Sequence, residues 1–186
     1  LKWPYASDGT LYAQYIPIQY NYIYDCGKNV DSIPPDGGSV EFNGLFIAAE
    51  NTCIAPNGYI FDSWAVSDTN DRLSAGERIE WPYAENKVLT ASYVPGTYTV
   101  TFHSNYDEDR TVVETFVYDN AYFLRQQYIR TGSDFVGYAT TPDGEVVYRD
   151  GAIVSNLTDV VGGNVDLYSI WETLTIPFEY DGNGGT

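Results

Sequence analysis

The chain has 186 residues, of which 44% are hydrophobic and 16% are Phe, Trp or Tyr, so packed cores are expected rather than global disorder. Nine Lys and Arg against 26 Asp and Glu give a net charge of −17, which repels a nucleic-acid backbone and an anionic membrane surface. We therefore expect no nucleic-acid partner, and no membrane insertion, since no apolar run reaches the roughly 20 residues that a spanning helix needs. With 18 Tyr and 17 Gly, the composition favours β-strands over helices.

The first 17 residues return later in the chain, which predicts a tandem repeat. Residues 1–17 read LKWPYASDGTLYAQYIP and residues 79–95 read IEWPYAENKVLTASYVP, an offset of 78 (79 − 1). The same offset carries Leu11 to Leu89 and then to Leu167. It also aligns three aromatic-rich strand openings, at residues 20–24, 98–102 and 176–180.

The repeat places the domain boundaries out of phase with the ends of the chain. We expect residues 1–17 to be the end of one unit, 18–95 and 96–172 to be complete units, and 173–186 to be the first strand of another. The chain lacks a starting Met and opens inside an element, so we expect a segment of a longer protein whose export signal or anchor lies elsewhere.

The elements of a unit are clearest between residues 96 and 186. Strict alternation predicts a strand with one buried face at 98–103, and the run at 176–181 alternates in the same way. An Asp-Asn opening followed by apolar residues at mixed spacing predicts a short helix or helical turn within 119–130. Further strands are expected at 111–118, 134–140, 146–148 and 165–171.

These elements predict an α+β fold that is predominantly β, made of small sheets with one covered face. The expected core residues are Phe61, Trp64, Leu89, Tyr93, Phe102, Phe135, Leu167 and Trp171. A unit of fewer than 80 residues has a marginal core, so a disulfide or contact with neighbouring units would help to stabilise it.

Several short motifs in this order resemble the Listeria–Bacteroides repeat, also called the internalin B-repeat. Gly58–Trp64 (GYIFDSW) is similar to its Gly-Tyr-x-Phe-x-Gly-Trp signature, and 178–186 (FEYDGNGGT) is similar to its first strand and Asn-Gly-Gly turn. The resemblance covers essentially the whole chain. It departs from the family at Ser63, which stands at a usual Gly, and in the second unit at Ser133 and Tyr138, which stand at the signature Tyr and Trp.

The resemblance implies tandem β-grasp-like modules on secreted or surface-exposed bacterial proteins, often adhesins, and the offset in this chain gives the modules a period of 78 residues. The fold, the repeats and the extracellular location are expectations at this point. The partner would be a protein or glycan at the cell surface, or neighbouring copies of the chain through the end strands.

Cys26 and Cys53 fall in the same predicted unit, and the next unit has Ser104 at the offset position of Cys26. A pair that is lost together favours a disulfide in an exported protein. The alternative is two independent buried thiols. A metal site would need further Cys or His residues nearby, so none is expected.

Other residues give little support for catalysis, and no enzyme activity or cofactor is expected. His103 is the only histidine and lies on the polar side of its predicted strand, which favours a solvated surface residue over a catalytic base. No Gly-x-Ser-x-Gly or phosphate-binding motif occurs. The acidic run Tyr106–Asp109 lacks the spacing of an EF-hand and is expected to be a solvated turn.

Trp81 and Tyr83, with their counterparts Trp3 and Tyr5, leave two functions open. Exposed rings would form an aromatic platform for a sugar or a partner, whereas buried rings would close the core, and burial is favoured. The leading expectation is a non-enzymatic spacer or adhesion module. The alternative is a carbohydrate-binding module that uses exposed Tyr and Trp faces.

Overall fold

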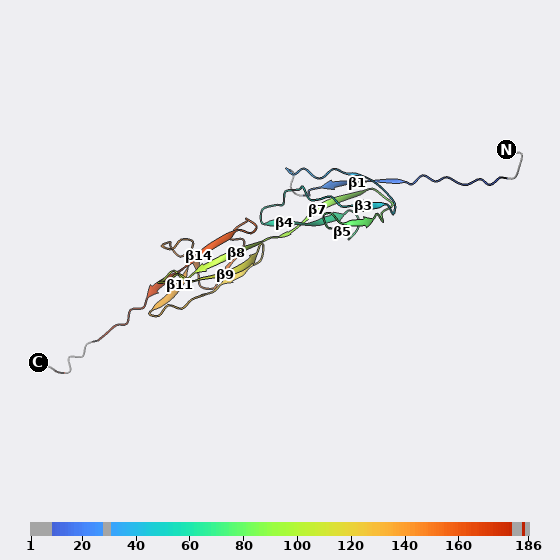
Figure 1. Cartoon of the computed structure of the whole chain (residues 1–186). Helices are drawn as coiled ribbons and strands as arrows, with labels where there is room; N and C mark the ends of the chain where they lie inside the picture. Colours follow the sequence, from blue (N-terminus) through green and yellow to red (C-terminus); the bar gives the residue numbers. More distant parts are fainter. Residues whose placement is uncertain (1–8, 28–30, 180–183, 185–186) are drawn as a thin grey trace. The chain divides into compact units, whose positions relative to one another are not determined.

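The computed structural model describes residues 9–27, 31–179 and 184, and every helix or strand among them is a β-strand. The chain divides into two compact units, Leu1–Ile54 with Phe61–Ser92 and Ala55–Ile60 with Tyr93–Thr186. The expectation of a predominantly β chain is confirmed (Figure 1). The helical part of the expected α+β class is wrong for the described residues, and the expected boundaries 18–95 and 96–172 stay predictions.

The first unit contains a five-stranded sheet in the order β2-β1-β7-β4-β5 and a two-stranded sheet of β3 and β6. β1 pairs with β2 antiparallel and with β7 parallel. The first and last long strands of the unit are therefore neighbours. The bounds are β1 (Gln19–Asp25), β2 (Gly38–Glu41), β3 (Leu45–Ile47), β4 (Tyr59–Val66), β5 (Arg72–Leu73), β6 (Arg78–Glu80) and β7 (Lys87–Pro95).

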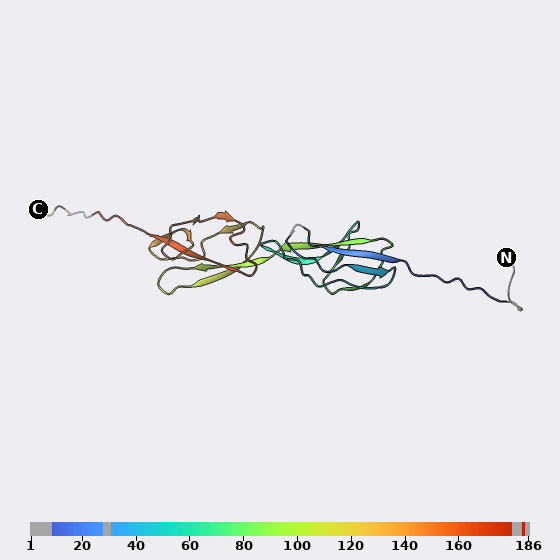
Figure 2. The same ribbon diagram turned by 90° about the horizontal axis from the view of Figure 1, so that it is seen from above.

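The second unit, coloured from yellow-green to red in Figure 2, has a corresponding sheet in the order β9-β8-β14-β11-β12 and a two-stranded sheet of β10 and β13. β8 pairs with β9 antiparallel and with β14 parallel. The position of each strand in the chain and in the sheet is therefore the same in both units. The bounds are β8 (Thr97–His103), β9 (Thr111–Val117), β10 (Tyr122–Leu124), β11 (Ser133–Ala139), β12 (Tyr148–Arg149), β13 (Ala152–Val154) and β14 (Asn164–Thr173).

The core of the second unit lies between its two sheets. Alternate residues of β8 are buried, as the apolar-polar pattern predicts. They pack with Leu167 of β14, Leu124 of β10 and Val154 of β13 in one cluster. The cluster shows that the two-stranded sheet covers one face of the five-stranded sheet. Its buried members are Tyr98, Val100, Phe102, Phe116, Leu124, Tyr138, Val154 and Leu167.

Aromatic rings build the corresponding core of the first unit. The ring of Trp64 in β4 lies 4.6 Å from that of Tyr24 in β1, and Phe46 of β3 lies 4.9 Å from Tyr22. Edge and tilted ring contacts of this kind add to the stabilisation that burial provides. Trp64 also donates from Nε1 to the carbonyl of Ala49 at 2.9 Å, so its polar atom is satisfied inside the core.

The helix expected within 119–130 is replaced by a turn and the short strand β10. Asp119 has a φ of 64°, outside the helical region, and the Asn120 amide donates to the Val117 carbonyl at 3.2 Å. The chain then enters β10, where Phe123 pairs with Ile153 of β13. Pairing with the distant strand β13 makes this segment a strand, and the spacing of its apolar residues does not reveal that pairing.

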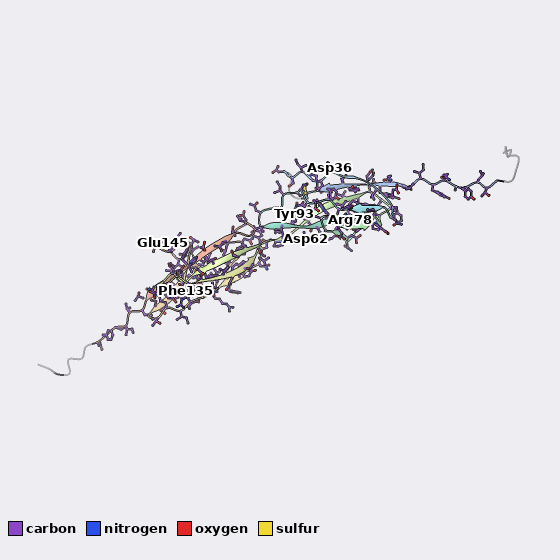
Figure 3. All side chains as sticks on the ribbon, viewed as in Figure 1. Asp36, Asp62, Arg78, Tyr93, Phe135 and Glu145 are labelled. Atoms are coloured by element: carbon purple, nitrogen blue, oxygen red, sulfur yellow. A yellow bond between two sulfur atoms is a disulfide. The ribbon has the colours of Figure 1, made fainter. Side chains whose placement is uncertain are left out.

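Half of the expected core residues are fully buried and half lie at the margin. Trp64, Leu89, Phe102 and Leu167 are at most 1% exposed. The other four, Phe61, Tyr93, Phe135 and Trp171, are half-buried. Figure 3 labels two of these, Tyr93 and Phe135. Phe135 precedes a register shift in β11, at which Gly137 is buried and a Cβ would lie 2.3 Å from the carbonyl oxygen of Tyr148. Glycine is therefore required there.

Candidate functional site

Trp81 lies inside the first unit, in the position of a cap that closes the core. It follows β6 and is 0% exposed. Its ring centroid lies 4.8 Å from that of Phe46 and 5.8 Å from that of Tyr22. Its backbone amide donates to the Gly44 carbonyl at 2.8 Å. The ring is covered on all sides and cannot act as a platform for a sugar in this structure.

Tyr83 is buried beside it and is fixed by polar contacts. Its hydroxyl donates to Asp71 Oδ2 at 2.7 Å, and Lys87 Nζ lies 5.2 Å from its ring centroid. Burial, followed by the hydrogen bond to the Asp71 carboxylate, raises the pKa of the Tyr83 hydroxyl far above its usual value. These contacts are structural. The counterparts Trp3 and Tyr5 lie outside the described residues.

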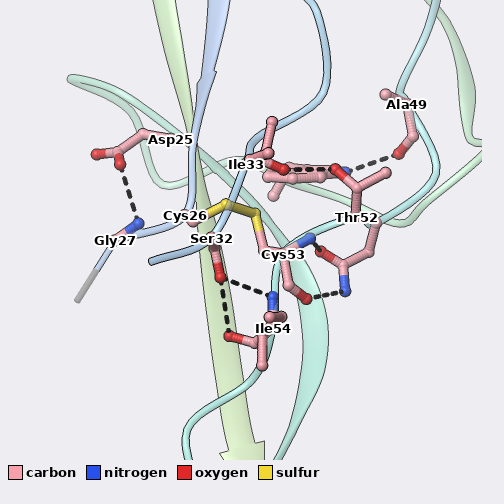
Figure 4. Close-up of a disulfide and its surroundings, with 11 residues drawn as sticks. Asp25, Cys26, Gly27, Ser32, Ile33, Ala49, Thr52, Cys53 and Ile54 are labelled. Carbon is pink, nitrogen blue, oxygen red and sulfur yellow. Dashed lines mark hydrogen bonds between the residues drawn. A yellow bond between two sulfur atoms is a disulfide. The ribbon is translucent and has the colours of Figure 1, made fainter. Parts of the chain in front are cut away.

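The expected disulfide joins Cys26, which follows β1, to Cys53 in the connection between β3 and β4 (Figure 4). The two residues are 27 apart in sequence, and both are buried. Hydrogen bonds hold the two connected segments together beside it. Thr52 Oγ1 donates to the Ile33 carbonyl at 2.9 Å, and the Ile54 amide donates to Ser32 Oγ at 2.9 Å.

The second unit uses hydrogen bonds at the position corresponding to Cys26. Ser104 is 0% exposed. Its hydroxyl accepts from the Arg110 amide at 2.9 Å, and its carbonyl accepts from Trp171 Nε1 at 2.8 Å. The chain leaving β8 is thus tied to β14, whereas in the first unit the chain leaving β1 is tied covalently to the connection before β4.

His103 is not the solvated side chain that the sequence favours. It lies at the end of β8, and its Nδ1 and Nε2 are 2.7 Å from Asp109 Oδ2 and 2.9 Å from Asp166 Oδ1. Its ring stacks on Tyr168 with centroids 4.3 Å apart. Both ring nitrogens are occupied by carboxylates, so the arrangement suits a fixed, charged imidazolium more than a base that activates a hydroxyl.

The two carboxylates control the charge of this histidine. Partial burial lowers the pKa of His103, but the hydrogen bonds that its ring donates to Asp109 and Asp166 outweigh burial and raise that pKa above 6.5. The hydrogen bond from His103 in turn lowers the pKa of Asp109. The ion pair of His103 with Asp109 therefore stabilises the fold in the pH range where both side chains are charged.

We expect the stability of the second unit to fall as pH rises through the raised pKa of His103. A group whose pKa is raised on folding stabilises the native state fully below its unfolded value, here 6.5, and loses that contribution above its folded value. Urea unfolding at a series of pH values should show this slope in the native chain. The slope should be absent in His103→Gln, and an equal slope in both chains would contradict the assignment.

The histidine belongs to a larger set of side-chain bonds that cross between β8 and β14, which we call the β8–β14 seam. Thr101 Oγ1 donates to Asn164 Oδ1 at 2.8 Å, and Ser169 Oγ donates to the His103 carbonyl at 2.8 Å. Five parallel residue pairs join the two strands, from Thr99 with Asn164 to His103 with Tyr168. The side-chain bonds of Thr101 and Ser169, together with those of Asp166 and Trp171, reinforce this backbone pairing. The first and last strands of the unit are thus joined by backbone and side-chain bonds together.

The first unit has a similar seam between β1 and β7. Four parallel residue pairs join these strands, from Tyr22 with Lys87 to Asp25 with Thr90. The Asn21 amide adds a bond to Asn86 Oδ1 at 2.8 Å. The alternation of side chains predicts these strands but not their parallel pairing, because the direction of pairing depends on the tertiary fold. The recurring offset between opening and closing strands was the available signal.

Within the described residues, no group of three or more His, Cys, Asp or Glu side chains is placed to hold a metal ion. In the acidic run after β8, Tyr106 donates to the Ile129 carbonyl at 3.0 Å and Asp109 is engaged by His103. In the part of the chain that the structure describes, no helix is long and apolar enough to span a membrane.

The sequence matches no model of a known protein family, and it has no match among curated proteins.

Proposed function

We propose that the chain is a non-enzymatic spacer made of tandem β-grasp-like units, from a secreted or cell-surface bacterial protein, and that each unit resists tension. The observation that carries the proposal is the parallel pairing of the first and last strands in each unit, β1 with β7 and β8 with β14.

Parallel pairing of terminal strands has a mechanical consequence. Tension that enters at the start of β8 and leaves at the end of β14 pulls the two strands in opposite directions along their length. All bonds of the seam then share the load and must fail nearly together. The five residue pairs and the side-chain bonds of Thr101, Asp166, Ser169 and Trp171 add to this shared resistance.

The connection between the units suits the same role. β7 ends at Pro95 and β8 begins at Thr97, so Gly96 alone separates the last strand of one unit from the first strand of the next. Tension along the polypeptide therefore passes from the closing strand of one unit to the opening strand of the next through a single residue. Additional support comes from the disulfide, which is typical of exported proteins, and from the resemblance to surface repeats.

Stretching the oxidised chain by its two ends in a force spectrometer tests the proposal. We expect two separate unfolding events. The disulfide keeps a loop of 27 residues closed, so at about 3.3–3.6 Å per residue the first unit should release roughly 90 Å less chain than it does after reduction. Units that extend without a resolvable force peak would contradict the spacer function.

A further inference from the structure

The segment before β1 carries an apolar face that is uncovered in this structure. In residues 9–18, Leu11 is 78% exposed, Tyr15 is 89% exposed and Ile16 is 91% exposed. None of residues 9–18 belongs to a strand. Large apolar side chains exposed together on one segment mark an interaction surface.

The 78-residue offset shows what kind of environment this face fits. Leu11 corresponds to Leu89 and Leu167, which are both 0% exposed at the centre of their sheets. Ala13 corresponds to Ala91 and Ser169, which are both small and buried.

Tyr15, two residues further along the chain, follows the same pattern. Tyr15 corresponds to Tyr93 and Trp171, both half-buried aromatic residues. A buried Leu, then a small residue, then an aromatic ring on alternate positions is thus the side-chain pattern of β7 and β14.

We infer that residues 9–17 are the closing strand of a further unit of this fold, and that their partner is a set of strands equivalent to β1–β6. The inference rests on the tandem repeat proposed above. In the first unit Leu89 pairs in parallel with Tyr24 of β1. An equivalent opening strand would therefore place an aromatic ring beside Leu11 and form a seam like the two already described.

The chain itself supplies a matched partner for this face. Because residue 79 corresponds to residue 1, a copy of residues 18–78 placed directly before Leu1 completes one unit and leaves the natural chain intact behind it. We expect this extended chain to show a third unfolding event on stretching, and slower amide exchange at Leu11 than in the natural chain.

Two substitutions distinguish docking in the predicted strand register from non-specific hydrophobic association. Leu11→Asp should abolish the third event in the extended chain and leave the natural chain unchanged. Gln14→Asp should preserve the third event, because Gln14 corresponds to the partly exposed Ser92 of β7. A third event that persists in Leu11→Asp would overturn the inference, as would added residues that stay unfolded.

Sedimentation of the natural chain tests the alternative, in which a second copy of the chain covers residues 9–17. We expect a monomer across the concentration range, because residues 173–186 of a second copy correspond in sequence to an opening strand alone and not to the remaining strands of a unit. Self-association that Leu11→Asp removes would mean that a second copy covers this face, and would overturn the inference. The spacer function is tested separately, by stretching the natural chain.

Discussion

Leu167→Ala is expected to destabilise the second unit by about 2–5 kcal/mol, the range for removing a large buried aliphatic side chain. Leu167 is 0% exposed in β14, and it pairs with Phe102 of β8 within the seam. A domain of this size has a total stability of roughly 5–15 kcal/mol or less. Urea unfolding followed by tryptophan fluorescence measures the change, because Trp171 reports on the second unit.

Two variants serve as controls for this substitution. Leu89→Ala removes the corresponding side chain of the first unit, which is also 0% exposed, and should leave the second transition in place. Val113→Ala changes β9 at a side chain that is 58% exposed, and should shift stability by about 0.5 kcal/mol or less. Equal effects of Leu167→Ala and Val113→Ala would contradict the core assignment.

Reduction of the Cys26–Cys53 disulfide is expected to lower the stability of the first unit by about 3–4 kcal/mol, the chain-entropy value for a closed loop of 27 residues. The physical reason is that the bond limits the conformations of the unfolded loop. The second unit holds no cysteine, so its transition should not move. Calorimetry with and without reductant measures both transitions.

A double variant, Cys26→Ser with Cys53→Ser, provides the control. It should unfold like the reduced native chain and show no further response to reductant. Loss of both transitions on reduction would show that the two units do not unfold independently. An unchanged first transition would show that the bond contributes nothing to stability.

Composition and alternation along the sequence predict the long strands closely. The expected strand at 111–118, which is rich in Val and Thr, is β9 (Thr111–Val117), and the expected strand at 165–171 lies within β14 (Asn164–Thr173). Alternate residues of β14 face the core, so its sequence shows a period of two. The expected strand at 146–148 is instead the two-residue β12 (Tyr148–Arg149), since a short edge pairing leaves little periodic signal.

Trp64 and Tyr138 show how two different residues can fill one role. Both are 0% exposed, in β4 and β11 respectively. Trp64 donates from Nε1 to the Ala49 carbonyl, and Tyr138 donates from its hydroxyl to the Arg125 carbonyl at 2.8 Å. Each ring is buried while its polar atom binds a connecting segment, so the two side chains make equivalent contacts in the two units.

The candidate site was only partly open to prediction from the sequence. The disulfide followed from the joint absence of both cysteines in the second unit. The bonds of His103 could not be foreseen, because Asp109 and Asp166 reach it from a loop and from a strand 63 residues away. Residue type alone could not decide between a platform and a cap at Trp81, since an aromatic ring serves either.

We propose that the parallel seam of each unit resists force along its strands, and the direction of pulling tests this role most directly. Handles attached at residues 97 and 173, the outer ends of β8 and β14, shear the β8–β14 seam. Handles attached at residues 99 and 164, which pair at one end of that seam, peel its bonds apart one at a time. We predict that the first geometry needs a several-fold higher unfolding force than the second. Equal forces in the two geometries would contradict the account.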